Sequence, residues 1–237
     1  FACLSFEVGL AAFNVVEAGV AASKLQWWAE ELALLSSGTA RHPLTQVLED
    51  SIVLSALPAQ AWQEWIGAAF AQREVAPARN LSELLTGVRA FHEPLARIKS
   101  ALYPNLSVDA EAHAGALCHV VLESVRHGES SAAERLPIPL DLLARHGLSR
   151  TGMGSAGPER DAVLRDHFAE LVQAMIGTDR VGLLPMTAAS LTADLKRCRV
   201  AGRSANPLET VAGNLDRLPF SAVWACWIAA RRVQPAR

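Results

Sequence analysis

The residues best suited to chemistry lie in the stretch 119–127, which holds two histidines, a glutamate and an arginine. His119, Glu123 and His127 are spaced i, i+4 and i+8, so a helix would place them on one side. They could bind a transition metal, or a diphosphate-like anion together with Arg126. The outer two positions span about 12 Å along a helix, so two of the three side chains can reach one ion but not all three. The alternative is a polar stripe that lines a cavity or faces solvent.

A second candidate is Arg41, which stands with His42 immediately before Pro43. Proline favours the first position of a helix, so Arg41 and His42 would precede a helix start. At that place they could contact an anionic group, since the first N–H groups of a helix attract negative charge. The alternative is an exposed arginine in a turn.

Other catalytic patterns are missing from the sequence. It contains no GxSxG motif, and the glycines of TGMGSAG (151–157) are not followed by the Lys-Ser/Thr of a phosphate loop. Cys118 lies in an apolar helical stretch and is expected in the core. Nucleophilic catalysis by serine or cysteine is therefore not expected.

The clearest of the elements that must position these residues is a helix in the stretch Lys24 to Pro43. Its apolar positions alternate in spacings of four and three, as on one face of an amphipathic helix: Ala21, Leu25, Trp28, Leu32 and Leu35. Ser36-Ser37-Gly38 should end it, because glycine adopts the left-handed backbone of a C-terminal cap.

Helical spacing recurs along the rest of the chain. We expect Phe6, Leu10, Phe13 and Val16 to share an inward face in residues 1–17, and Leu44, Val47, Leu48 and Ile52 to do so in a helix over 43–55. Further helices are predicted from Pro58, from an N-cap at Ser82, and over 109–126, 159–176, 185–202, after Pro207 and over 220–232. Residues 127–135 should form a loop and 151–158 a flexible linker. No long β-type alternation appears, so the fold class is predicted to be all-α.

Bulk composition limits the classes of function. The 237 residues are 51% apolar, the net charge is −2, and charges of both signs are interspersed, which argues against nucleic acid as the main partner. The four cysteines have no metal-site spacing, so a reducing cytoplasm is expected. No run of eighteen apolar residues exists, so at most peripheral contact with the inner membrane is expected. The chain begins at Phe1 within an apparent helix, and we expect an N-terminal segment to precede it.

Several segments, in order, resemble the squalene/phytoene synthase family. They are FACLSFEVGLAAF (1–13), KLQWWAEEL (24–32) with RHP (41–43), LPIPLDLLARHGLSR (136–150) and LPFSAVWACWIAARR (218–232). The resemblance implies one domain over 1–237, an isoprenoid-synthase-like helical bundle around a central cavity. Active members join two prenyl diphosphates, using Mg²⁺ held by DxxxD motifs on facing helices. The spacing suits this role, because carboxylates at i and i+4 share a helix face and can hold Mg²⁺ against a leaving diphosphate.

The chain departs from the family at both motif positions. The first helix offers only Glu7 and Glu17, and in the second Arg126 matches the family's arginine, with His127 and Ser131 where the aspartates would stand. This loss resembles a non-enzymatic branch that includes a mitochondrial respiratory complex I assembly factor. We therefore expect a non-catalytic protein that needs no cofactor and either binds an isoprenoid or other lipid chain or serves in assembly with a protein partner.

Two alternatives remain open. The first is an active head-to-head prenyl diphosphate transferase with unconventional metal ligands, for which Mg²⁺ would be required. The second is a helical interaction module without a cavity. The ligand-binding candidates are His119, Glu123, Arg126, His127 and Arg41.

Overall fold

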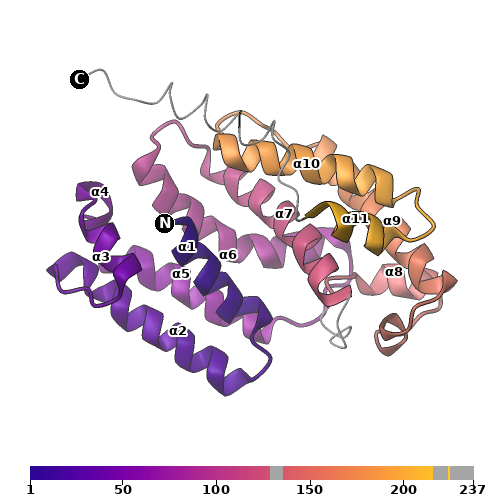
Figure 1. Cartoon of the computed structure of the whole chain (residues 1–237), viewed down its shortest axis with the longest axis horizontal. Coiled ribbons are helices and arrows are strands. Elements are labelled where there is room, and N and C mark those ends of the chain that lie inside the picture. The colour runs from indigo at the N-terminus through magenta and orange to yellow at the C-terminus, as the bar shows by residue number, and fades with distance from the viewer. Residues whose placement is uncertain (129–135, 216–223, 225–237) are drawn as a thin grey trace. The chain divides into compact units, whose positions relative to one another are not determined.

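A computed structural model describes residues 1–128, 136–215 and 224 of the chain (Figure 1). Every regular element in these residues is a helix, which confirms the all-α class for the described part of the chain. The α-helices are α1 (Ala2–Gly9), α2 (Ala18–Ala33), α3 (Pro43–Glu49), α4 (Ile52–Ser55), α5 (Ala59–Ala71), α6 (Leu81–Leu102), α7 (Val108–Gly128), α8 (Leu140–Arg145), α9 (Pro158–Ile176), α10 (Pro185–Ala201) and α11 (Pro207–Leu215). A π-helical turn, η1 (Leu10–Asn14), and the short 3₁₀ turns η2 (Leu35–Ser37), η3 (Gln72–Glu74) and η5 (Thr151–Gly154) complete the set.

The chain forms two compact units. Unit 1 comprises residues 1–76 and 90–109, and unit 2 comprises 77–89 and 110–237. Helix α6 contributes residues to both. A single domain and a central cavity stay predictions, and each unit is described below by itself.

The core of unit 1 is built on the tryptophans of α5. Trp62 and Trp65 are buried, and the ring of Phe1 lies 6.3 and 6.4 Å from them. Helix α2 packs along α5, and its predicted apolar stripe is buried throughout, as expected for a helix that meets its neighbour with one face. Gly38 ends this region with a φ of 66°, so the predicted left-handed cap is confirmed.

Two predicted inward faces in unit 1 are wrong. Phe6 is 54% exposed, because α1 turns Leu4 and Val8 inward and a residue midway between them lies on the opposite side of a helix. Val16 is 71% exposed, because the helix passes into the π-helical turn and ends at Asn14. An extra residue per turn rotates the following side chains around the axis, so a constant 3.6-residue period no longer predicts the buried face.

The helix predicted over 43–55 is broken into α3 and α4. Ser51 interrupts it, since its backbone is extended and its hydroxyl accepts the N–H of Leu54 as a new N-cap. As a result Ile52, which was expected inside, is 86% exposed. Val47 was also expected inside and is 68% exposed, because α3 turns Thr45 and Leu48 inward instead.

Unit 2 packs α7, α9 and α10 around one apolar core. Phe168, Leu117 and Leu164 are fully buried there, and α9 packs against both α10 and α11. Cys118 lies against this core as predicted. The buried carboxylate of Glu111 on α7 accepts from the backbone N–H of Leu184 at 3.2 Å and the hydroxyl of Thr187 at 2.7 Å, which satisfies donors at the start of α10.

Local predictions in unit 2 need three corrections. Asn80, not Ser82, caps α6, with its side-chain oxygen accepting the N–H of Glu83 at 2.9 Å. The expected linker 151–158 contains the turn η5, which buries Met153. The loop expected over 127–135 does not begin at His127, because α7 continues to Gly128. Residues 129–135 and, apart from position 224, the helix predicted over 220–232 lie outside the described residues.

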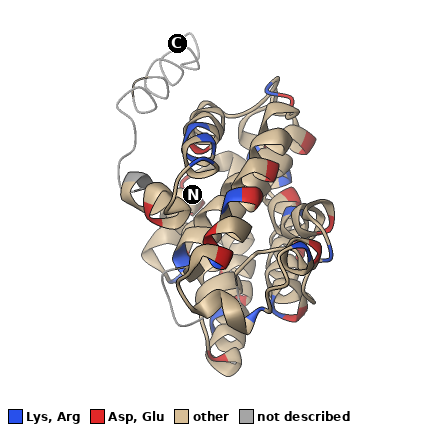
Figure 2. Ribbon diagram, turned by 90° about the vertical axis from the view of Figure 1, so that its right-hand side faces the viewer, with Lys and Arg blue, Asp and Glu red and all other residues tan. Residues whose placement is uncertain are grey.

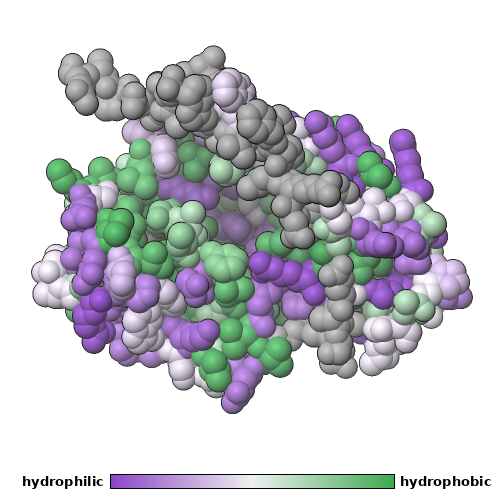
Figure 3. Space-filling view, in the orientation of Figure 1, coloured by the Kyte–Doolittle hydropathy of each residue, from purple (hydrophilic) through white to green (hydrophobic). Residues whose placement is uncertain are grey.

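Charges of both signs are interspersed along the helices (Figure 2), and hydrophobic residues lie among hydrophilic ones on the face in Figure 3. No helix within residues 1–128 and 136–215 combines the length and the apolar character needed to cross a bilayer.

Candidate functional site

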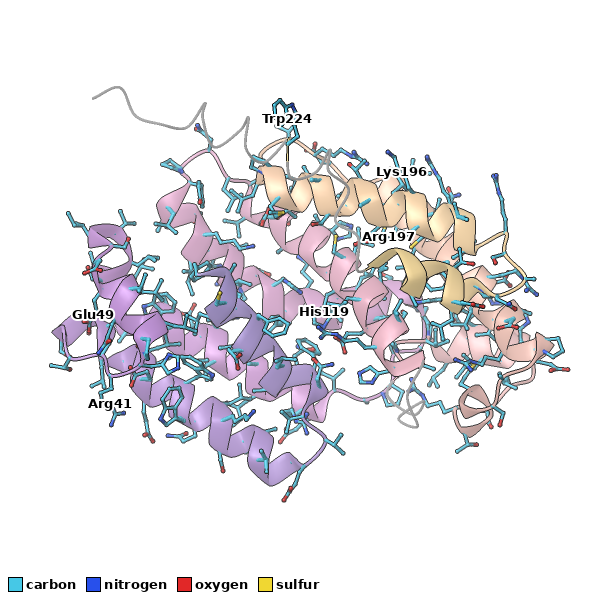
Figure 4. All side chains as sticks on the ribbon, in the orientation of Figure 1. Arg41, Glu49, His119, Lys196, Arg197 and Trp224 are labelled. Carbon is cyan, nitrogen blue, oxygen red and sulfur yellow. The ribbon has the colours of Figure 1, made fainter. Side chains whose placement is uncertain are left out.

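Helix α7 brings four of the five candidate residues together. Glu123 and His127 are 5% and 8% exposed, and the His127 Nε2 lies 2.9 Å from the Glu123 Oε2. The Arg126 NH1 lies 3.1 Å from the other carboxylate oxygen, Oε1. Both oxygens of a buried carboxylate are thus engaged by basic side chains one turn further along the same helix, in a charge-assisted arrangement. We call His119, Glu123, Arg126 and His127 the α7 cluster; His119 is labelled in Figure 4.

The environment sets the charges of this cluster. Burial raises the pKa of Glu123, but the hydrogen bond from His127 and the charges of His119, His127 and Arg126 together lower it below 4.5. Burial lowers the pKa of His119 from 6.5 to about 4, although Glu123 opposes this shift. At neutral pH the cluster therefore contains an ionised carboxylate, a guanidinium and a neutral imidazole at position 119.

The fifth candidate, Arg41, lies in unit 1. Its guanidinium pairs with the buried carboxylate of Glu31 at 3.2 Å, although its own side chain is 64% exposed. Glu31 also accepts the backbone N–H groups of Arg41 at 2.6 Å and of His42 at 2.7 Å, and the hydroxyl of Thr45 at 2.7 Å. The anionic group expected near this helix start is thus a side chain of the protein itself.

Glu31 is tied to the start of α3 by these contacts. Burial raises its pKa, but the hydrogen bonds from His42, Thr45 and Arg41 outweigh that effect and lower it from 4.5 to about 2. The imidazole of His42 accepts the N–H of Leu44 and lies 5.2 Å from the ring of Trp28. The arrangement fastens α3 to α2, which is a structural role.

A buried Ser–His pair was not predicted. The Ser124 Oγ lies 3.1 Å from the His167 Nε2 and donates its own proton to the carbonyl of Val120 at 2.7 Å. With the hydroxyl proton on the Val120 carbonyl, the Nε2 of His167 donates to the Ser124 Oγ and the Nδ1 is unprotonated. Burial lowers the pKa of His167 from 6.5 to about 3. In this arrangement the histidine does not accept the serine proton, as the base of a nucleophilic serine would.

A second unpredicted group joins α7 and α10. Asp194 and Arg197 form a buried ion pair at 2.7 Å, and the thiol of Cys118 hydrogen-bonds to Asp194. Burial raises the pKa of the Cys118 thiol well above 9, so it is not a reactive thiolate. The i, i+3 spacing of Asp194 and Arg197 is visible in the sequence, but the contact with Cys118 depends on how two helices pack.

Within residues 1–128, 136–215 and 224, no three His, Cys, Asp or Glu side chains meet in a group that could hold a metal ion. Glu123 and His127 are the pair of candidate donors that the α7 cluster brings into direct contact. Arg126 already occupies the other oxygen of this carboxylate.

No family model, curated protein or solved structure matches this chain. The resemblance to the squalene/phytoene synthase family therefore rests on the sequence segments given above.

Proposed function

We propose that the chain is a squalene/phytoene-synthase-like protein that does not catalyse prenyl transfer and instead binds an isoprenoid or other lipid chain. The observation that carries this proposal is the state of Glu123. Its two oxygens are engaged by Arg126 at 3.1 Å and His127 at 2.9 Å. In a prenyl transferase the carboxylate oxygens must face the Mg²⁺ ion that assists departure of the diphosphate. The oxygens of Glu123 instead face two basic side chains of the same helix.

The cluster offers one group that suits the head of an anionic lipid. Arg126 has a side chain 34% exposed, against 6% for Glu123 and 10% for His127, and its guanidinium is suited to contact an anionic head at the end of an apolar chain. Neutral His119 adds no charge at physiological pH, since its pKa is about 4. Val120 and Val121 on the same helix belong to the apolar core of unit 2.

The proposal includes a place in the cell and a kind of partner. We propose a cytoplasmic protein with at most peripheral membrane contact, in which ligand binding or assembly with a protein partner replaces catalysis. No cofactor is needed for this role. Mg²⁺ belongs only to the alternative, an active prenyl diphosphate transferase.

The test measures diphosphate release from farnesyl and geranylgeranyl diphosphate with Mg²⁺, and the melting temperature with each compound and with farnesol. We expect no release and a raised melting temperature. Arg126→Gln should weaken the effect of the two diphosphates but not that of farnesol. Glu123→Gln should strengthen it, because it removes a negative charge and frees Arg126 for the anion.

The matched control is Glu170→Gln, which removes a carboxylate of a more exposed ion pair, with Arg145, in the same unit. It should leave all three ligand effects unchanged. Diphosphate release that a chelator abolishes would establish the active transferase instead. If none of the three compounds changes the melting temperature, the proposal of lipid binding is wrong. The helical interaction module without a cavity would then be favoured.

A further inference from the structure

The outward face of α10 carries positive charge without acidic partners. Lys196 and Arg199 are exposed, and their spacing of three residues places them on one side of the helix; the exposed Arg203 follows in the turn after α10 ends at Ala201. The buried residues Leu191, Asp194 and Cys198 lie on the opposite side. Figure 4 shows Lys196 on the outer edge of α10 and Arg197, which pairs with Asp194, on its inner edge.

A fourth cation extends this row. Arg180 precedes α10, and its guanidinium donates to the hydroxyl of Thr192 at 3.0 Å, one turn before Lys196. Arg180, Lys196, Arg199 and Arg203 form the basic face, and none of them makes an ion pair with any residue of the described part of the chain. Asp179, the nearest acidic residue in the sequence, uses its carboxylate to accept the N–H of Val181 at 2.9 Å.

Exposed apolar side chains accompany these cations. Val200 is 59% exposed and follows Arg199, while Val181 and Met186, at 77% and 52%, stand at the other end of the row. Apolar side chains left in water beside basic ones are typical of a surface that meets a lipid interface, where cations contact phosphates and apolar groups enter below them.

We propose that the basic face of α10 binds the surface of a bilayer that contains anionic phospholipids. A nucleic acid would satisfy the cations but would leave Val181, Met186 and Val200 in water. This proposal concerns a different surface from the α7 cluster and holds whether or not that cluster binds a ligand.

The experiment is sedimentation of the full chain with vesicles of phosphatidylcholine and phosphatidylglycerol, compared with pure phosphatidylcholine vesicles. We expect binding to the anionic vesicles only, weakening as salt is added. Each basic side chain near such a surface contributes about fivefold to partitioning, so Lys196→Gln with Arg199→Gln should lower it about 30-fold. Val200→Ser should lower it at high and low salt alike, because it acts through apolar contact.

The matched control is Lys24→Gln with Arg79→Gln, which removes the same charge from exposed positions elsewhere in the chain. Binding should be unchanged in this control. An equal loss in the control would show a general charge effect and overturn the proposal. So would the absence of sedimentation with anionic vesicles, or binding to a single-stranded oligonucleotide that needs Lys196 and Arg199 while vesicles are not bound.

Discussion

The carboxylate of Glu31 on α2 accepts the backbone N–H of His42 at 2.7 Å, immediately before α3 begins. One buried acidic side chain thereby satisfies donors at the start of another helix, where a negative charge is also favoured by the helix dipole.

Glu31→Gln should therefore destabilise the protein by about 2 kcal/mol, the typical contribution of hydrogen bonds to a charged group. Because folding lowers the pKa of Glu31 from 4.5 to about 2, its ionised form stabilises the fold above pH 4.5, and this contribution is lost as the pH falls towards 2. Urea unfolding at neutral and acid pH measures both effects. Glu30→Gln is the control, since the side chain of that exposed neighbour accepts a hydrogen bond from Gln26 and is tied to no helix start in the described part of the chain. Equal losses in the two variants would contradict the buried role of Glu31.

His167 should make the fold sensitive to acid. Its folded pKa of about 3 lies below the ordinary 6.5, so the unfolded chain binds a proton more readily in this range, and stability falls as the pH drops from 6.5 towards 3. The contribution is about 1.4 kcal/mol per pH unit. His167→Gln keeps a donor for Ser124 and should reduce the slope of unfolding free energy against pH by that amount. His146→Gln, at a more exposed histidine paired with Asp166, should leave most of this slope intact. An unchanged slope in His167→Gln would show that this residue is not the buried neutral group.

A buried and a partly exposed tryptophan of unit 1 should contribute differently to the free energy of unfolding. Trp65→Ala removes a fully buried ring between Phe1 and Phe91 and should cost about 4 kcal/mol of unfolding free energy. Trp27→Ala removes a ring that is 39% exposed, and should cost less than half of that. Chemical denaturation of the two variants measures the difference. Similar losses would mean that the core is not organised around α5.

Gly128 tests the packing of α7 against α11. A Cβ atom at this position would lie 2.6 Å from the terminal methyl carbons of Leu208, so this side chain must shift, and Gly128→Ala should destabilise unit 2 by about 1 kcal/mol. Combining it with Leu208→Ala should give less than the sum of the two losses, because the second change makes room for the methyl group. Gly67→Ala on α5 is the control: its Cβ would meet nothing within 4 Å, and alanine should stabilise that helix by about 0.5–1 kcal/mol. Strict additivity would contradict the contact between Gly128 and Leu208.

The sequence by itself determined the all-α class and the clearest helices. The spacing of Leu25, Trp28 and Leu32 predicted a buried stripe because a regular helix repeats its environment every three to four residues. The same rule failed at Val16 and Ile52, since a π-helical turn changed the period before Val16 and a serine cap broke the helix before Ile52. Neither event leaves a mark in a hydrophobic pattern.

Contacts of the candidate residues within one helix could also be predicted from the sequence, whereas contacts between helices could not. Local spacing along one helix placed His127 and Arg126 beside Glu123, and the structure gives these contacts. Tertiary structure alone decided that Arg41 meets Glu31, and that Ser124 meets His167 from a helix 43 positions away. Contacts between helices depend on how whole faces pack and which polar groups lose water together, and no short spacing in a sequence encodes that choice.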